Sequence, residues 1–206
     1  MFTNYGDLNE FQLDALREIG NIGSGNAASS LSLMLDKPVD IAMPKIKILG
    51  YEEVIQNLGG PERPLVSLLL ILGGDVTGMI MFLLHQEFAH MVLSTLTGQE
   101  IGEIGSLDEF SGSAMREVGN IMAASYVNAI SEMTGLSIEL SVPSMSIDMA
   151  GAVLSVPAIY YANISDKIIF IEDEFNRATD HASSHILMIP EVGSLQKIMD
   201  SLGLGE

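Results

Sequence analysis

Two stretches of the sequence repeat the same polar side chains at the spacing of one helix face. Each stretch carries an Asp or Ser, a Glu, an Asn and a small residue at intervals of four, three and four. These positions are Asp14, Glu18, Asn21 and Gly25, and Ser113, Glu117, Asn120 and Ala124. Such intervals place side chains along one face of an α-helix. A carboxylate and a carboxamide together can hold charge and both donate and accept hydrogen bonds, and the small residue lets a partner approach closely.

These polar residues belong to a longer internal repeat. Residues 7–48 align without a gap on residues 106–147, an offset of 99, and Pro44 falls on Pro143. Such self-similarity indicates a duplicated structural unit. A single Glu-x-x-Asn is most often solvated helix surface. Since a solvated face need not keep the same residues in two diverged copies, the repeat favours a functional role, although shared ancestry accounts for part of the match.

Each unit is expected to open with a long helix, ending near residue 35 in the first copy and residue 133 in the second. The runs that start at Asp7 and Ser106 fit a capping box that opens each helix. Apolar residues at spacings of three and four predict a buried stripe on each helix. The predicted stripe residues are Phe11, Ala15, Ile19 and Ile22, and Phe110, Ala114, Val118 and Ile121.

The rest of each unit predicts strands followed by a closing helix. In the first unit the strands are residues 39–49, 65–72 and 76–84, and the helix is 86–97. In the second, strand candidates are 137–149, 152–161, 167–172 and 185–189, the polar residues 173–184 form a loop, and the helix is 194–202. Pro44 and Pro143 mark an edge, a bulge or a break in their strands, because proline cannot donate to a sheet.

The predicted fold class is therefore α+β, built from a duplicated helix–three strands–helix unit. The two units, approximately residues 7–99 and 106–204, are expected to form one domain over residues 1–206. In this domain they share one β-sheet about a pseudo-two-fold axis. The strand order within that sheet does not follow from the sequence.

Composition excludes several functions. The 206 residues include 27 acidic and 9 basic side chains, a net charge of −18, which argues against binding nucleic acid or an anionic membrane. The chain has no cysteine, which excludes disulfides, thiolate metal sites and cysteine nucleophiles. The apolar region 65–84 is interrupted by Gly73-Gly74-Asp75, so neither part is long enough to span a bilayer as a helix. We therefore expect a soluble cytoplasmic protein without membrane insertion.

The repeated motif resembles a known family. The pattern [Asp/Ser]-x-x-x-Glu-x-x-Asn, with 22 residues between the Asn and a Pro, is the signature of the CheC, CheX and FliY chemotaxis phosphatases. It occurs twice here, ending at Pro44 and at Pro143. The duplication and the length are most similar to those of CheC. The resemblance implies a CheC-like fold and an enzyme of two-component signalling that hydrolyses the aspartyl phosphate of the response regulator CheY.

The resemblance also implies roles for the motif residues. The phosphorylated receiver brings its own Mg²⁺ and lysine, so the phosphatase needs neither a cofactor nor a metal site of its own. Asn21 and Asn120 would orient the attacking water, and Glu18 and Glu117 would bind a receiver lysine. Asp14 and Ser113, which open the motif, would support the docking face. Which of the two sites is more active is left open.

A second hypothesis is a non-catalytic adaptor. Resemblance to CheC brings another partner, the receptor deamidase CheD, and Asp148 is the acidic candidate for that contact. The alternative for Asp148 is a strand-end carboxylate in water. Two weaker signals are set aside. The glycines around Asn21 lack the order of a phosphate-binding loop. The four histidines have no carboxylate fixed beside them to complete a metal site.

Overall fold

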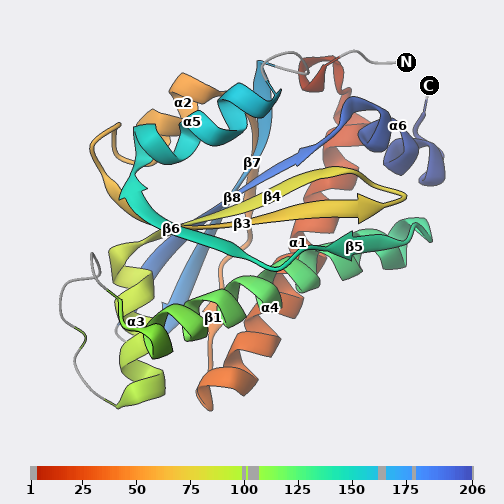
Figure 1. Cartoon of the computed structure of the whole chain (residues 1–206). Coiled ribbons are helices and arrows are strands. Elements are labelled where there is room, and N and C mark those ends of the chain that lie inside the picture. Colours follow the sequence, from red (N-terminus) through yellow and green to blue (C-terminus); the bar gives the residue numbers. More distant parts are fainter. Residues whose placement is uncertain (1–3, 99–100, 102–106, 162–165, 178–179, 206) are drawn as a thin grey trace.

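The computed structural model describes residues 4–98, 101, 107–161, 166–177 and 180–205 (Figure 1). Within these residues the helices are η1 (Tyr5–Asp7), α1 (Glu10–Leu35), α2 (Tyr51–Asn57), α3 (Gln86–Thr97), α4 (Glu109–Thr134), α5 (Ala150–Tyr161) and α6 (Val192–Ser201). The strands are β1 (Asp40–Ile41), β2 (Lys45–Gly50), β3 (Pro64–Gly74), β4 (Gly78–His85), β5 (Ile138–Leu140), β6 (Ser144–Met149), β7 (Lys167–Arg177) and β8 (Asp180–Pro190). None of the described helices is both long and apolar enough to cross a lipid bilayer.

All the described strands join one antiparallel sheet, which confirms the predicted α+β class. The order is β1-β7-β8-β4-β3-β5, with β2 also paired to β7 and β6 also paired to β3. Exchanging the strands of the two units reverses this order and leaves it otherwise unchanged, as a pseudo-two-fold axis between β4 and β8 requires. Each unit therefore pairs its first, broken strand with the hairpin of the other unit.

Different pairs of helices cover the two faces of the sheet (Figure 1). The long helices α1 and α4 pack against each other and lie on one face, where Gly20 contacts Ile46 of β2 and Gly119 contacts Leu68 of β3. On the opposite face lie α2 and α5. They are joined by the Tyr51 hydroxyl, which donates to the carbonyl of Pro157 at 3.1 Å. The strand core between these layers is apolar, with Leu68 and Phe82 fully buried.

The structure confirms both long helices and both proline breaks, but it corrects the second unit. Residues 152–161, predicted as a strand, belong to helix α5, since a short apolar run fits a buried helix as well as a strand. Of residues 173–184, predicted as a loop, 173–177 lie in β7 and 180–184 in β8, while 178–179 lie outside the described residues. Helix α2 was not predicted. Each unit is thus a helix, a broken strand, a second helix, a hairpin and a closing helix.

The caps and the buried stripes also differ from the prediction. Helix α1 is capped by Asn9, which exchanges hydrogen bonds with Gln12, and α4 by Asp108. Asp7 is therefore not the cap of α1, and Ser106 lies outside the described residues. Phe11 and Phe110 are 74% and 62% exposed rather than buried. Most buried positions lie one residue later in the sequence than predicted, because small residues and glycines lie against the sheet in place of the predicted side chains. In α1 it contains Gln12, Leu16, Ile19, Gly23, Ala27, Leu31 and Leu35.

Candidate functional site

The repeated polar residues lie on the outer faces of α1 and α4. Asp14 and Glu18 are exposed on α1, and Asn21 is half-buried. On α4, Ser113 and Glu117 are exposed and Asn120 is half-buried. The structure therefore brings each predicted Glu and Asn onto one solvent-facing surface of its own helix. Both carboxylates remain accessible to a partner.

The glycine before each asparagine sets how that asparagine is presented. A Cβ atom added at Gly20 would lie 2.5 Å from Ile46 Cδ1, and one added at Gly119 would lie 2.9 Å from Leu68 Cδ1. Only glycine lets the helix backbone approach the sheet this closely. The next residue points about 100° around the helix. Asn21 and Asn120 therefore sit at the rim of the helix–sheet contact, on backbone that is held firmly and with side chains that reach solvent.

The two arginines of the repeat have different surroundings. Arg17 forms an ion pair with Asp14 and approaches the Glu10 carboxylate at 3.9 Å. Arg116 is half-buried, and its guanidinium lies beside Gly112 on the same helix. Asp14 is thus engaged within α1. The other carboxylate of the first motif is Glu18, which lies one helical turn before Asn21.

A buried polar network connects the two helices with the sheet. The Ser24 hydroxyl donates to Asp173 Oδ1 at 2.9 Å and lies 2.6 Å from the Tyr126 hydroxyl, which donates to Asp173 Oδ2 at 2.7 Å. Burial raises the pKa of Asp173 to about 6, although both hydrogen bonds act against this shift. Burial, and then the Asp173 charge, raise the pKa of Tyr126. Ser24 lies three residues after Asn21, so the network fixes α1 one turn beyond its motif.

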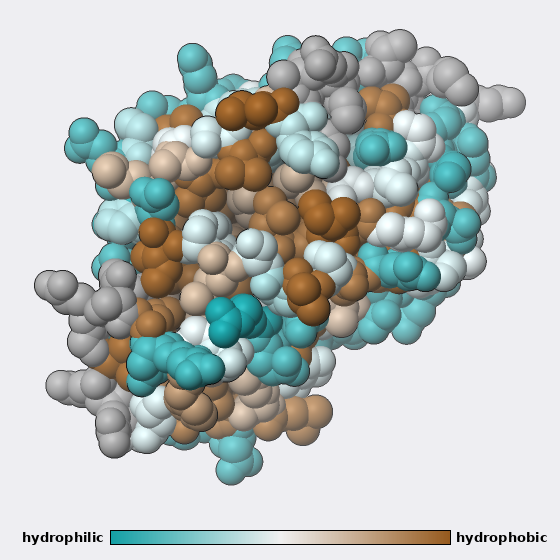
Figure 2. All heavy atoms as spheres, in the orientation of Figure 1, coloured by the Kyte–Doolittle hydropathy of each residue, from teal (hydrophilic) through white to brown (hydrophobic). Residues whose placement is uncertain are grey.

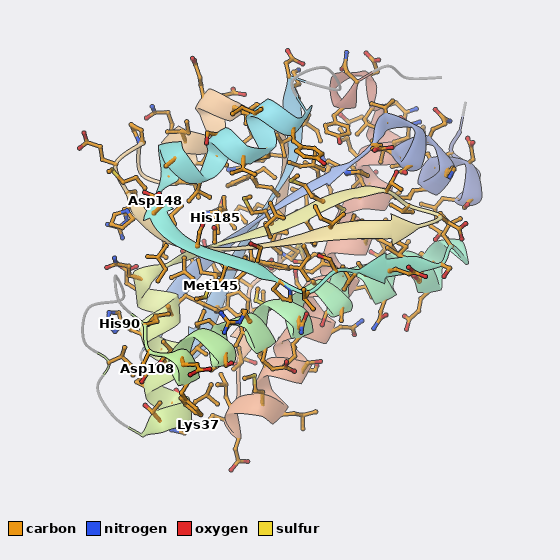
Figure 3. The ribbon with its side chains drawn as sticks, in the orientation of Figure 1. Lys37, His90, Asp108, Met145, Asp148 and His185 are labelled. Atoms are coloured by element: carbon orange, nitrogen blue, oxygen red, sulfur yellow. The ribbon has the colours of Figure 1, made fainter. Side chains whose placement is uncertain are left out.

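Asp148 is not brought together with the motif helices. It lies near the end of β6, beside the start of α5, and is exposed (Figure 3). Its side chain helps line a hollow between β6 and α5, together with Ser67, Leu69, Met81, Ser144, Ser146, Ala152, Val153 and Val156. This hollow is on the sheet face opposite α1 and α4. The structure therefore separates the predicted residues into two surfaces.

Two histidines from neighbouring strands lie side by side in the sheet. The rings of His85 and His185 are 5.1 Å apart in an edge-on arrangement. Burial lowers the pKa of both, that of His185 to about 4. In the part of the chain that the structure describes, no group of three His, Cys, Asp or Glu side chains is arranged to hold a metal ion.

Comparison with known proteins shows to which family the chain belongs. The model of the CheC-like family matches residues 11–48 and 110–147, one segment in each repeat. The CheY-P phosphatase CheC of Bacillus subtilis is 33% identical over 204 residues, which cover 97% of each chain. The chain belongs to the CheC-like family. Both segments of this CheC-like chain begin at the exposed phenylalanine and include the motif and the proline.

More distant relatives share the fold. The flagellar motor switch phosphatase FliY of Bacillus subtilis is 29% identical over 142 residues, which cover 68% of this chain and 37% of that protein. The crystal structure of Thermotoga maritima FliY aligns with a TM-score of 0.76 at 20% identity, covering 97% of this chain and all of that one. A chemotaxis protein CheX from Desulfovibrio desulfuricans aligns with a TM-score of 0.52 at 18% identity, covering 83% of this chain and 99% of that one.

The sequence interpretation missed the buried network, because it assigned Asp173 to a solvated loop. A signal was present in the alternation of Ile171, Asp173 and Phe175, which places all three on one face of a strand. The structure buries all three completely or nearly so. A carboxylate between two inward-facing apolar residues is the pattern that predicts a buried, hydrogen-bonded acid.

Proposed function

We propose that the chain is a phosphatase that hydrolyses the aspartyl phosphate of phosphorylated CheY. The observation that carries this proposal is the pair of equivalent Glu and Asn side chains on the accessible faces of α1 and α4. Similarity over 97% of the chain to a relative named CheY-P phosphatase CheC supports the substrate.

The proposed mechanism relies on positioning. In phosphoryl transfer, most of the catalytic gain comes from aligning the attacking group and stabilising charge on the phosphoryl oxygens. The receiver supplies Mg²⁺ and a lysine for the charge. The carboxamides of Asn21 and Asn120 can donate to one oxygen and accept from another, so each can hold a water in line with the bond that breaks. Their half-buried positions beside Gly20 and Gly119 limit the rotamers available to each amide.

The two glutamates serve docking in this proposal. Glu18 and Glu117 are exposed and lie one turn before their asparagines. A receiver lysine that pairs with either carboxylate would bring the phosphoryl group next to the amide on the same helix face. Such a pair loses strength as salt rises. The Michaelis constant for phosphorylated CheY is therefore expected to increase with ionic strength, whereas the turnover number should change little.

Substitution of the two asparagines tests the mechanism. We expect N21A and N120A each to retain part of the activity, and the double variant to lose about 10²-fold or more in the rate of phosphate loss from phosphorylated CheY. Asn26→Ala and Asn128→Ala are matched controls, because both asparagines are exposed on the same two helices outside the motif. Full activity in the double variant would reject the mechanism, and an unchanged CheY-phosphate lifetime with the wild-type chain would reject the function.

A second proposed function, compatible with the first, is binding of CheD through the opposite face. Its support is an exposed apolar surface on and next to α5, formed by Met149, Val156, Ile159 and Tyr160 beside Asp148. Figure 2 shows hydrophobic side chains gathered on this side of the molecule. Apolar side chains rimmed by a charge are typical of protein interfaces.

Calorimetric titration with CheD tests this second proposal. We expect Asp148→Ala and Ile159→Ala to weaken CheD binding by about 10-fold each, while CheY dephosphorylation stays at the wild-type rate. Glu139→Ala is a matched control, because Glu139 is an exposed acid on β5. If the wild-type chain gives no binding signal with CheD, in the presence or absence of phosphorylated CheY, the adaptor hypothesis is wrong.

A further inference from the structure

Both motif helices expose a phenylalanine near their first turn. Phe11 is the second residue of α1 and is 74% exposed, and Phe110 is the second residue of α4 and is 62% exposed. The two occupy equivalent positions, separated by the repeat offset of 99. A large aromatic side chain in water costs free energy that burial would recover. One exposed phenylalanine needs no explanation, but the same one in both copies indicates a shared use.

Each phenylalanine lies on the same helix face as its motif. Phe11 precedes Glu18 by seven residues and Phe110 precedes Glu117 by seven, which is two helical turns and about 10 Å along the axis. The exposed residues of α1 on this face are Phe11, Asp14, Glu18 and Gly25, with the half-buried Asn21 among them. One partner docked over the Asn would therefore reach the Phe, since a standard protein interface covers about 800 Å² on each side.

The surroundings of the phenylalanines are acidic and, on α4, hollowed. Phe110 lines a shallow depression with Asp108, Glu109 and Ser113. Phe11 is preceded along its helix by Glu10 and followed by Asp14 and Glu18, all exposed, and Arg17, which pairs with Asp14 and lies near Glu10, offsets one of these three charges. An aromatic side chain on a surface with a net negative charge fits a partner that presents an apolar depression bordered by lysine or arginine. A second copy of this chain, with its net charge of −18, is a poor electrostatic match.

We propose that Phe11 and Phe110 are docking anchors that insert into an apolar, lysine-bordered depression of the phosphorylated receiver beside its phosphoaspartate. The inference rests on the proposed phosphatase function and adds a specificity-determining contact to it. The asparagine acts on the water, the glutamate selects a positive charge, and the phenylalanine contributes apolar contact area two turns away. Hot-spot residues at interfaces are characteristically aromatic.

Variants of the two phenylalanines separate docking from chemistry. We expect F11A/F110A to raise the Michaelis constant for phosphorylated CheY by about 10-fold or more and to leave the turnover number within about twofold. Its affinity for CheY activated by beryllofluoride, measured by calorimetry, should fall by a similar factor. F11L/F110L should recover part of the loss. Leu33→Ala is the matched control, since Leu33 is 85% exposed on α1 and lies outside the motif.

The outcomes distinguish this inference from the function on which it rests. If the wild-type chain binds activated CheY without dephosphorylating it, the proposed function fails, and the anchors are judged by binding alone. An active wild type with an unchanged Michaelis constant and affinity in F11A/F110A overturns the anchors but keeps the function. No binding by the wild type overturns both. A wild-type dimer that F11A/F110A converts to a monomer, as measured by sedimentation, also overturns the inference, because the phenylalanines would then contact a second copy.

Discussion

Helices α1 and α4 present equivalent polar residues to solvent, but the residues through which they contact each other are not equivalent. Gly23 of α1 lies against the ring of Tyr126 on α4, where an added Cβ would be 2.7 Å from Tyr126 Cδ1. At the positions related by the repeat, the chain has Met122 and Ala27, both buried. In both pairs, Gly23 with Tyr126 and Ala27 with Met122, the larger residue is on α4. The outer faces of the two copies remained alike while the contact between them became asymmetric.

The same asymmetry created the buried network. Ser24 and Tyr126, which hold Asp173, have Ala123 and Ala27 as their repeat equivalents, so only one such network is possible across the helix pair. It fixes α1 directly after its motif, whereas α4 is held six residues beyond Asn120. The outer faces of α1 and α4 therefore carry the same polar residues, but the buried contacts that hold the two helices differ. The following variants test this comparison, beginning with the largest expected effect.

Exchanging the Gly23 and Tyr126 pair should have the largest effect. Tyr126→Ala removes a fully buried aromatic side chain and is expected to lower the free energy of unfolding by about 3–5 kcal/mol in urea denaturation. Adding Gly23→Met should recover at least about 1 kcal/mol, because the pair then consists of a methionine and an alanine, the residue types at the repeat-related positions Met122 and Ala27. Gly23→Met alone should destabilise the fold, since its side chain would overlap the Tyr126 ring.

A glycine on the outer face provides the control for this exchange. Gly25 is exposed, and an added Cβ would meet no atom within 4 Å. Gly25→Ala should therefore stabilise the protein by up to about 1 kcal/mol, the helix-propensity difference. If the effects of Tyr126→Ala and Gly23→Met were simply additive, the two residues would not be a complementary pair, and the comparison of the helix contacts would be wrong.

The Asp173 carboxyl should give a smaller effect that depends on pH. Its pKa is raised from 3.8 to about 6, so the folded chain binds this proton more tightly than the unfolded chain. Deprotonation between about pH 4 and pH 6 therefore destabilises the fold. Asp173→Asn cannot deprotonate. Its free energy of unfolding relative to wild type should rise by about 1.4 kcal/mol between about pH 5 and pH 7.5.

This pH experiment has an internal control in the other titrating groups. His85 and His185 titrate in both proteins, so their contributions cancel in the difference between variant and wild type. Ser24→Ala removes one donor to Asp173 and keeps the carboxyl. It should lower the free energy of unfolding, and more at high pH, where the carboxylate is charged. A difference between Asp173→Asn and wild type that does not change with pH would contradict the assigned burial of the charge.

The ion pair on the outer face of α1 should have the smallest effect. Arg17 and Asp14 are both largely exposed, so Arg17→Ala is expected to change the free energy of unfolding by less than about 0.5 kcal/mol. Arg116→Ala, at the equivalent half-buried position, should cost somewhat more through lost packing. A larger loss of stability for Arg17→Ala than for Arg116→Ala would reverse this part of the comparison.

The sequence was sufficient to predict the long helices and the position of the motif. Both helices contain 26 residues, and periodic segments of this length give a strong pattern. It could not decide which of two adjacent apolar stripes faces the core. Phe11 was placed inside because of its hydrophobicity, whereas the backbone at Gly20 and Gly23 makes the closest contacts. Close packing through glycine depends on the partner surface, which local spacing does not contain.

The second unit was harder to predict for a related reason. Helix α5 and the ends of β7 and β8 depend on their neighbours in the sheet and in the layer above it. Asp173 is polar in sequence and completely buried in the structure, since Ser24 and Tyr126 arrive from distant parts of the chain to satisfy it. Asp148, the candidate for the CheD contact, lies near the end of β6 and shares no surface with the motif residues of α1 and α4.

The exchange of first strands between the units affects how the protein is made. Lys45 of β2 pairs with Glu172 of β7, 127 residues later in the chain. Pairings of such long range make folding slow, and they cannot form until both segments have left the ribosome. Helix α1 is synthesised early, but β2, the strand that Gly20 contacts, has no strand to pair with until β7 has been synthesised. The motif faces of α1 and α4 should therefore become able to bind a partner at the same time, late in folding, instead of one after the other.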